Sequence, residues 1–332
     1  MSDASFSYQR TTDDSCFLCG SQAESITQEH VFPKWLQHLY ALWNQRIGLL
    51  NDTLIQYRSL RIPCCSTCNQ GNLSRLESVI SSAVASGYEA CIALDERLLY
   101  LWAGKIYYGM LRKEIDLLRY RAHPDEGSII PAETLKSFSN LHLFLQGIRG
   151  EHEFSANPPY SVLVCNLHDV GTPRNYCFRD SLQHMTLAIR MGEIGIIVAL
   201  EDVGLTKETY GRYVTEVAGR KLHPIQFDEL YAKVVYQISL HEGGVTYITS
   251  RSASGQPHVR THVLGGGYLR VQSQADFSNI LRAYVSDWLK SNGDDTQWFV
   301  PPNLVPTWLT DKAGQLLLQS LSSWESGEIL DT

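Results

Sequence analysis

The chain has 332 residues, of which 44% are hydrophobic and 19% charged, and its formal net charge is −7 at pH 7. This composition is typical of a globular protein with a sizeable core and predicts about two domains. It excludes a low-complexity chain, and the acidic balance argues against a surface coated with basic residues for nucleic acid. The polar N-terminus does not have the pattern of a signal or transit peptide, and no apolar run approaches the roughly 18 residues that span a bilayer. We therefore expect no membrane contact and a cytoplasmic location.

The first half of the chain predicts an arm followed by helices. Residues 1–15 are polar and predict a flexible arm. A helix is predicted over 33–44, where a proline suits the first turn, and Asn69 or Asn72 can cap the start of a second helix. A long helix rich in apolar residues is predicted over 95–121. The segment "PAETLKSFSNLHLFLQGIR", after the breaker "HPDEG", predicts a fourth helix.

The second half of the chain has a different pattern of apolar residues and turns. From about residue 158, short β-branched segments such as "YSVLVCNL", "MTLAIRM" and "IGIIVAL" alternate with glycine and polar turns and predict strands. A helix is predicted over 226–238, two more strands follow it, and two helices are expected near the C-terminus, over 275–291 and 311–324. The predicted fold class is α+β. The predicted boundaries place the arm at 1–15, a small N-terminal module at 16–90, a helical region at 91–150 and a mixed α+β accessory domain at 151–332.

Four of the eight cysteines form two Cys-x-x-Cys pairs, Cys16 with Cys19 in "CFLCG" and Cys65 with Cys68 in "CSTC". Each pair places two thiolates about one turn apart, and zinc takes four such ligands tetrahedrally. Cys64 is a spare neighbour, but its spacing of four from the last cysteine is less usual, so Cys65 is assigned. In a reducing compartment such pairs indicate metal sites or redox pairs more often than structural disulfides, and buried free thiols are the alternative. A zinc ion with four cysteine ligands has no open position, so the predicted site is structural.

A larger pattern joins these pairs. The Glu-His step in "EHVFP" lies between them, and the second pair is followed directly by asparagine in "CSTCN". Together these motifs resemble the HNH endonucleases. More narrowly, "ITQEHVFPKWL" with "CSTCNQGNLSRLE" resembles a bacterial HNH subgroup in which the module opens a longer chain. The resemblance covers about residues 14–80. It implies a ββα-metal fold stapled by a structural zinc site of four cysteines, and a hydrolase that cleaves phosphodiester bonds in DNA.

The resemblance also implies roles for individual residues. His30 matches the general base that takes a proton from the attacking water, and a neutral imidazole suits this task at cellular pH. Glu29 matches the acidic metal ligand beside it, and Asn69 matches the ligand at the start of the helix. Asn72 follows one helical turn later, where a second ligand could point at the same ion. Such oxygens suit Mg²⁺, with Mn²⁺ as a substitute, and would hold one catalytic ion at the scissile phosphate.

Two features depart from the family pattern, and others allow a plainer interpretation. The last helix position, often histidine in the family, is asparagine here. The family's middle asparagine is missing from "YRSLRIPC", and Asn51 is only a weak replacement because it lies earlier. The Glu-His step could instead be a helix-capping carboxylate and a packed histidine, and the two asparagines are reasonable helix caps. The basic residues of this segment are predicted to contact nucleic acid, with solvated surface as the alternative: Lys34, Arg58, Arg61 and Arg75.

The sequence therefore predicts a metal-dependent HNH endonuclease that acts on DNA, with bacterial anti-phage defence or restriction as its context by analogy. Two alternatives stay open. One is a zinc-stapled nucleic-acid-binding or scaffold protein whose HNH-like site is inactive, and the other is an HNH nuclease that cleaves RNA. A homodimer would let two sites address two strands. The large C-terminal region could take a regulatory partner or ligand.

Overall fold

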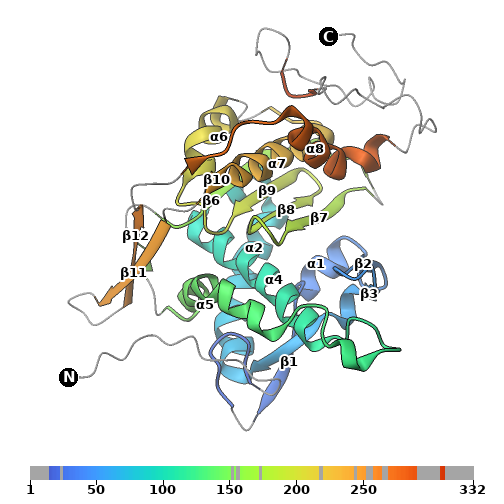
Figure 1. The fold of residues 1–332 in the computed structure, drawn as a ribbon, viewed down its shortest axis with the longest axis vertical. Helices are drawn as coiled ribbons and strands as arrows, with labels where there is room; N and C mark the ends of the chain where they lie inside the picture. Colours follow the sequence, from blue (N-terminus) through green and yellow to red (C-terminus); the bar gives the residue numbers. More distant parts are fainter. Residues whose placement is uncertain are drawn as a thin grey trace. The chain divides into compact units, whose positions relative to one another are not determined.

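A computed structural model describes residues 15–22, 25–150, 153–154, 158–171, 174–216, 220–242, 245–251, 257–263, 268–289 and 307–310. These residues form a mixed structure of helices and strands, so the predicted α+β class is confirmed at this level (Figure 1). The predicted arm, apart from Ser15, and the predicted helix over 311–324 lie outside the described residues. No described helix combines the length and the apolar character that crossing a bilayer requires.

The chain divides into two compact units. The first contains Met1–Ser86, Ala93–Pro158 and Tyr247–Thr261, and the second contains Gly87–Ile92, Pro159–Thr246 and His262–Thr332. The first unit therefore holds most of the predicted module and of the predicted helical region. The domain boundaries drawn from the sequence stay predictions.

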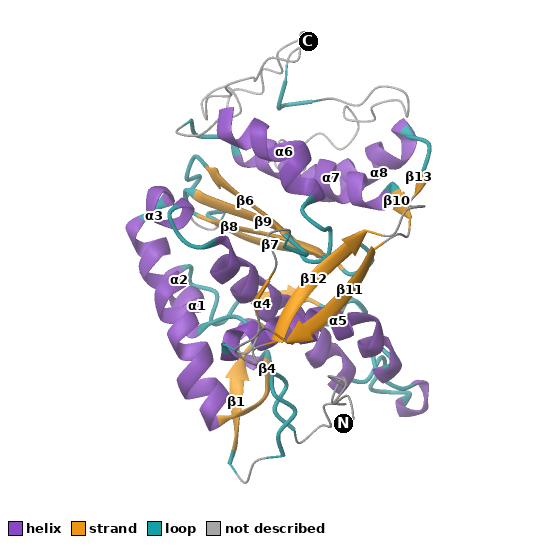
Figure 2. Cartoon of the chain, turned by 90° about the vertical axis from the view of Figure 1, so that its left-hand side faces the viewer, coloured by secondary structure: helices purple, strands orange, loops and turns teal. Residues whose placement is uncertain are grey.

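The first unit is built on a pair of antiparallel strands. β1 (Ile26–His30) pairs with β4 (Arg61–Cys65) in a register that sets Ile26 opposite Cys65 and His30 opposite Arg61 (Figure 2). A π-helical turn and a helix follow β4 directly. The other elements of this unit are α1 (Lys34–Leu39), β2 (Arg46–Gly48), β3 (Leu54–Gln56), η1 (Tyr57–Ser59), η2 (Thr67–Leu73), α2 (Ser74–Ser86), α4 (Glu96–Asp116), η3 (Pro124–Glu126), η4 (Ala132–Phe138), α5 (Ser139–Leu145), η5 (Gln146–Arg149) and β5 (Glu153–Phe154).

Local chemistry explains where these helices begin and end. α4 starts after Asp95, whose carboxylate accepts a hydrogen bond of 2.9 Å from the main-chain amide two residues on. The helix predicted over 33–44 ends earlier, at Leu39, and Ala41 just beyond it has a positive φ of 53°. The second predicted helix is interrupted at Gly87, whose φ of +95° ends α2.

α4 forms the core of the first unit. Apolar and aromatic residues occupy most of its positions, so it is buried on nearly all sides, in agreement with the sequence pattern. At Gly109 the helix approaches the strand pair closely, because a Cβ there would lie 3.2 Å from the side chains of Ile62 and Val31. α4 therefore packs directly behind β1 and β4 and can bring its own side chains to the ends of these strands.

The second unit contains a four-stranded antiparallel sheet in the order β6-β9-β8-β7, with α6, α7 and α8 on one side of it (Figure 1). β8 and β9 are buried along their whole length, which explains their continuous apolar sequences. α7 packs closely on the sheet, because a Cβ at Gly195 would lie 2.5 Å from the ring of Phe227. The elements of this unit are α3 (Tyr88–Ile92), β6 (Ser161–Asn166), β7 (Tyr176–Ser181), β8 (Thr186–Met191), β9 (Ile194–Ala199), α6 (Leu205–Glu216), α7 (Pro224–Ser239), β10 (His241–Glu242), β13 (Tyr268–Leu269) and α8 (Gln274–Leu289). β11 (Val245–Arg251) and β12 (Pro257–Val263) cross the division between the units.

Candidate functional site

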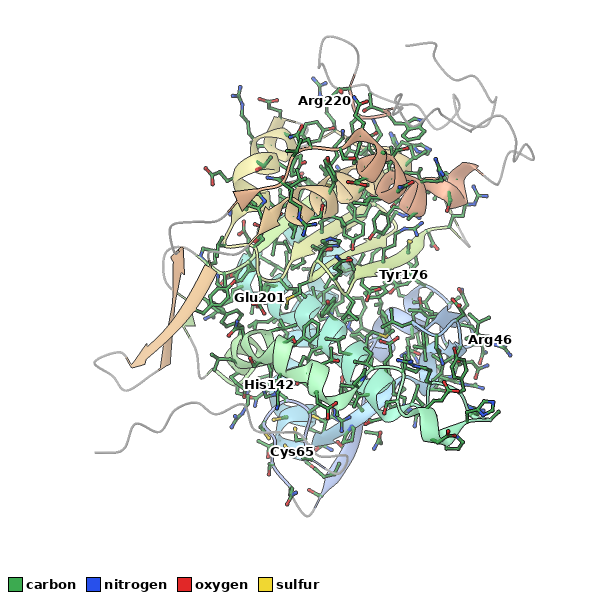
Figure 3. The ribbon with its side chains drawn as sticks, in the orientation of Figure 1. Arg46, Cys65, His142, Tyr176, Glu201 and Arg220 are labelled. Carbon is green, nitrogen blue, oxygen red and sulfur yellow. The ribbon has the colours of Figure 1, made fainter. Side chains whose placement is uncertain are left out.

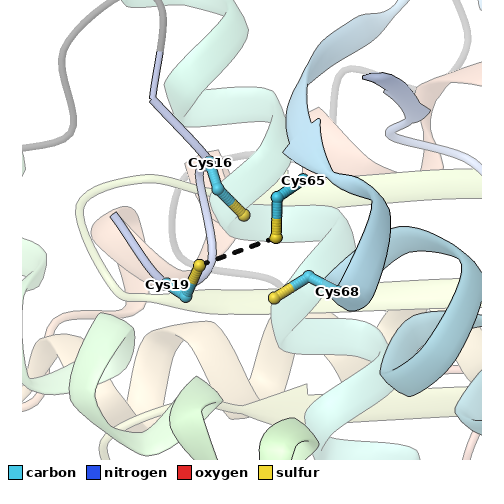
Figure 4. Close-up of side chains that lie close together, drawn as sticks. All are labelled: Cys16, Cys19, Cys65 and Cys68. Atoms are coloured by element: carbon cyan, nitrogen blue, oxygen red, sulfur yellow. Dashed lines mark hydrogen bonds between the residues drawn. The ribbon is translucent and has the colours of Figure 1, made fainter. Parts of the chain in front are cut away.

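The four paired cysteines gather at one point of the first unit (Figure 4). The sulfur atoms of Cys16, Cys19, Cys65 and Cys68 lie within 4.8 Å of one another, and Cys19 Sγ is 3.8 Å from Cys65 Sγ. Four sulfurs placed tetrahedrally at about 2.3 Å from a zinc ion would be about 3.8 Å apart. Among the described residues, this is the one group of three or more histidine, cysteine or acidic side chains with such closeness. The cluster can therefore hold a metal ion such as zinc.

The fifth cysteine, Cys64, lies beside this cluster, with its Sγ 3.8 Å from that of Cys16. It is fully buried and precedes Cys65 in β4, where successive side chains point to opposite faces. Hydrogen bonding with Cys64 and Cys68 lowers the pKa of the Cys16 thiol, while burial raises the pKa of Cys19 to about 11. A bound cation would bring all four thiols to the thiolate form, which is the form that ligates metal.

α5 anchors the turn that carries the first cysteine pair. His142 of α5 is labelled in Figure 3, and its Nε2 lies 3.1 Å from the carbonyl oxygen of Phe17. Gln146, at the start of η5, donates a hydrogen bond of 2.7 Å from Nε2 to the carbonyl oxygen of Leu18. Burial lowers the pKa of His142, so the ring is neutral and donates through one nitrogen. Neither residue was predicted from the sequence, because 125 or more residues separate each from its partner. They hold the turn between Cys16 and Cys19 in place.

A polar cleft of about 600 Å³ lies where β1, α1, η2 and α2 meet. It brings together three residues predicted from the sequence to act in catalysis, Glu29, His30 and Asn69, and one predicted nucleic-acid contact, Lys34. α2 contributes a row of hydroxyl groups to the lining, together with one acidic residue that was not predicted from the sequence. These α2 residues are Ser74, Glu77, Ser78, Ser81 and Ser82.

His30 is held in a tight environment, with only 7% of its surface exposed. Burial, and then the positive charges of Arg61 and Lys34, lower the pKa of its imidazole to about 4, so the ring is neutral at cellular pH. Its Nδ1 lies 3.4 Å from Gln37 Nε2, which also donates a hydrogen bond of 2.7 Å to the Phe32 carbonyl oxygen. A donor at Nδ1 favours the tautomer that carries its proton on Nε2. For His30 to accept a proton at Nε2, it needs the other tautomer, which carries its proton on Nδ1.

Glu29 does not stand free in the cleft, because it is paired with a buried lysine. Lys105 of α4 donates from Nζ to Glu29 Oε1 at 2.6 Å and to Glu77 Oε1 at 2.9 Å. Burial alone would lower the pKa of Lys105, but the two carboxylates outweigh it and raise this pKa. Burial also raises the pKa of Glu77, and the nearby ammonium offsets part of that shift. In the sequence, the one sign of this pairing is a single lysine inside the apolar run "LYLWAGKIYYGM", which indicates a buried negative partner for Lys105.

The remaining predicted residues differ in whether they line the cleft. Asn69 lines the cleft, and its Nδ2 donates to Thr27 Oγ1 at 2.8 Å. Asn72 does not line it, and its Oδ1 accepts a hydrogen bond of 2.6 Å from Arg75. Three of the basic residues predicted to contact nucleic acid also lie outside the lining of this cleft: Arg58, which donates to Asn44 and Gln56, Arg61, which donates to the Arg58 carbonyl oxygen, and Arg75.

Comparisons with protein-family models, with curated proteins and with solved structures return no match for this chain. What the fold and the site define is a mixed α+β protein with a four-cysteine cluster beside a polar cleft. Any more specific assignment depends on the chemistry of the residues described above.

Proposed function

We propose that this chain is a metal-dependent endonuclease of the HNH type that hydrolyses phosphodiester bonds in DNA. The observation that carries this proposal is the common cleft of Glu29, His30 and Asn69, which belong to two segments about 40 residues apart. The antiparallel pair of β1 and β4, followed by η2 and α2, supports it, because a ββα-metal module has this order of elements. The cysteine cluster beside β4 agrees with a structural zinc site in such a module.

Each residue of the cleft has a role in this proposal. The neutral imidazole of His30 accepts a proton from the attacking water, and Glu29 and Asn69 supply oxygen ligands for Mg²⁺ or Mn²⁺. A divalent ion in such a site stabilises negative charge on the scissile phosphate and on the leaving oxygen. The four cysteines hold zinc as a structural ion, because a closed set of four ligands leaves no position for water or substrate.

The direct test is nicking of supercoiled plasmid by the purified full chain, with Mg²⁺, Mn²⁺ or EDTA, and with zinc counted on the same samples. We expect nicking with a divalent ion and none with EDTA, at about one zinc per chain. Transfer RNA treated in parallel tests the RNA-cleaving alternative. Absence of cleavage of both substrates under every metal condition would contradict the proposed activity.

Lys34 is expected to contact a phosphate of the bound nucleic acid, because it is exposed, lines the cleft and lies close enough for its charge to lower the pKa of His30. The replacement Lys34→Ala should reduce the slope of log affinity against log salt by about 1 for duplex DNA. Fluorescence anisotropy of a labelled duplex at several salt concentrations measures this slope. Arg75→Ala is the matched control, because Arg75 lies outside the cleft lining and donates to Asn72. Equal slopes for Lys34→Ala and the unmodified chain would contradict the predicted contact.

A second candidate function is a zinc-stapled nucleic-acid-binding or scaffold protein without cleavage activity. Two contacts favour it: the Gln37 amide at His30 Nδ1 disfavours the tautomer that a base at Nε2 requires, and Lys105 already pairs with Glu29. This candidate predicts nucleic-acid binding that persists in His30→Ala, with zinc present and no nicking in any metal. The plasmid experiment therefore distinguishes the two candidates.

The wider context is also part of the proposal. We propose a cytoplasmic nuclease in bacterial anti-phage defence or restriction, whose C-terminal region takes a regulatory partner or ligand. A homodimer would allow two clefts to cut two strands of one duplex. Sedimentation of the chain with and without duplex DNA measures this stoichiometry.

A further inference from the structure

The ammonium group of Lys105 is a meeting point of three parts of the first unit. It is 1% exposed and donates to the Glu29 carboxylate on β1 at 2.6 Å and to the Glu77 carboxylate on α2 at 2.9 Å. It also donates to two main-chain oxygens at the end of β1, those of His30 at 2.7 Å and Val31 at 3.2 Å. An ammonium has three N–H donors, so these four contacts occupy all of them.

This arrangement has consequences for the cleft. The contact to the His30 carbonyl oxygen fixes the main chain that carries the imidazole, and the contact to Glu29 fixes the direction of the carboxylate beside it. The contact to Glu77 ties both to α2, which also lines the cleft. A buried lysine is costly to desolvate, and this cost is offset only where good partners surround the ammonium. The partners here are residues of the candidate site.

We propose that Lys105 is a positioning residue, which sets the orientation of Glu29 and of the main chain at His30 relative to α2. The inference deepens the proposed nuclease function and rests on it for its readout of activity. The competing interpretation is that Lys105 only neutralises buried negative charge. The two carboxylates of Glu29 and Glu77 and the ammonium of Lys105 together carry one net negative charge. A variant that keeps this net charge but lacks the hydrogen bonds of Lys105 therefore separates the two interpretations.

Three variants carry the test. Lys105→Met removes the ammonium and leaves two uncompensated carboxylates. The double variant Lys105→Met/Glu77→Gln restores the net charge of the cluster but not the hydrogen bonds to Glu29 and His30. Glu77→Gln alone keeps Lys105 bound to Glu29. The control is Arg112→Met, because Arg112 lies two turns further along α4, is also 1% exposed and pairs with Asp116 on its own helix, outside the cleft lining.

The first readout is the nicking rate at saturating Mn²⁺, with thermal stability and zinc content measured on the same samples. We expect at least a tenfold slower rate for Lys105→Met and for the double variant, while the double variant regains thermal stability over the single one. Arg112→Met should nick within about threefold of the unmodified chain, once folded. Glu77→Gln keeps the contacts of Lys105 to Glu29 and His30, so it should nick faster than the double variant. Recovery of the nicking rate in the double variant, or an unchanged rate in Lys105→Met, would overturn the positioning role. If Lys105→Met does not fold, the double variant decides.

The second readout does not depend on activity. Long-range ¹H–¹⁵N spectra report the ring nitrogens of histidines, and the signals of His30 are assigned by their loss in His30→Gln. We expect these signals to shift in the double variant and to stay in place in Arg112→Met. Unchanged signals in the double variant would overturn the inference even for a chain that nicks. If the unmodified chain does not nick, the nuclease proposal fails, and the spectra still decide the role of Lys105.

Discussion

The replacement Cys65→Ser is expected to empty the four-cysteine cluster of its metal and to unfold the first unit. The sulfur of Cys65 is part of the quartet whose members lie within 4.8 Å of one another, and its neighbour Cys19 belongs to a distant segment. Structural zinc sites contribute roughly 10–16 kcal/mol of apparent binding energy, which is comparable to the whole stability of a domain, about 5–15 kcal/mol. We expect about one zinc per chain in the unmodified protein and almost none in the variant, by elemental analysis, with loss of the cooperative thermal transition of the unit.

Cys64→Ala is the matched control for this experiment. Cys64 is the adjacent residue of the same strand, is fully buried, and has its sulfur 3.8 Å from Cys16. If the ligand set is the quartet that contains Cys65, Cys64→Ala keeps its zinc and loses only the stability of a small buried side chain, about 1 kcal/mol. The opposite result, zinc retained in Cys65→Ser and lost in Cys64→Ala, would show that the ligand set is assigned wrongly.

The replacement His30→Ala is expected to slow metal-dependent nicking by about 10²–10⁴-fold. His30 is the one imidazole among the residues that line the described cleft, and its pKa of about 4 leaves it unprotonated at neutral pH. In the proposed mechanism, the attacking water would then have to lose its proton to solvent. Rates are measured at saturating Mn²⁺ on samples of equal zinc content, so that a loss of structure is not mistaken for a loss of the base.

His38→Ala is the control for this effect. His38 is exposed on α1, and its ring stacks on that of Trp43 with the centroids 4.9 Å apart. The ring centroid of the buried His30 lies 5.7 Å from that of the same tryptophan. The control removes an imidazole from the same region without touching the cleft lining, so its nicking rate should stay near that of the unmodified chain. A His30→Ala variant that nicks as fast as His38→Ala would remove His30 from the mechanism.

Much of the local structure could be predicted because its causes lie within a few residues. Two cysteines separated by two residues are close in almost any turn, so each Cys-x-x-Cys pair predicted half of the cluster. The dense apolar positions after Asp95 predicted α4, although it ends at Asp116 and not at 121. The alternation of β-branched segments with glycine predicted the strands that form the sheet of the second unit. The end of the helix predicted over 33–44 was wrong, because the positive φ at Ala41 has no signal in a residue that favours helices.

The contacts that complete the candidate site come from residues far apart in the chain. Lys105 meets Glu29 across 76 positions, and His142 meets the Phe17 carbonyl across 125. A lysine inside an apolar helix indicates that a negative partner exists, but the choice of partner depends on which strand the helix packs against. Here the close approach of α4 to the strand pair at Gly109 determines that Lys105 pairs with Glu29. The residue types of the site and their local spacing could thus be predicted from the sequence. The pairing of Glu29 with Lys105 and the position of the Gln37 amide beside His30 follow only from the packing of α4 and α1 around β1.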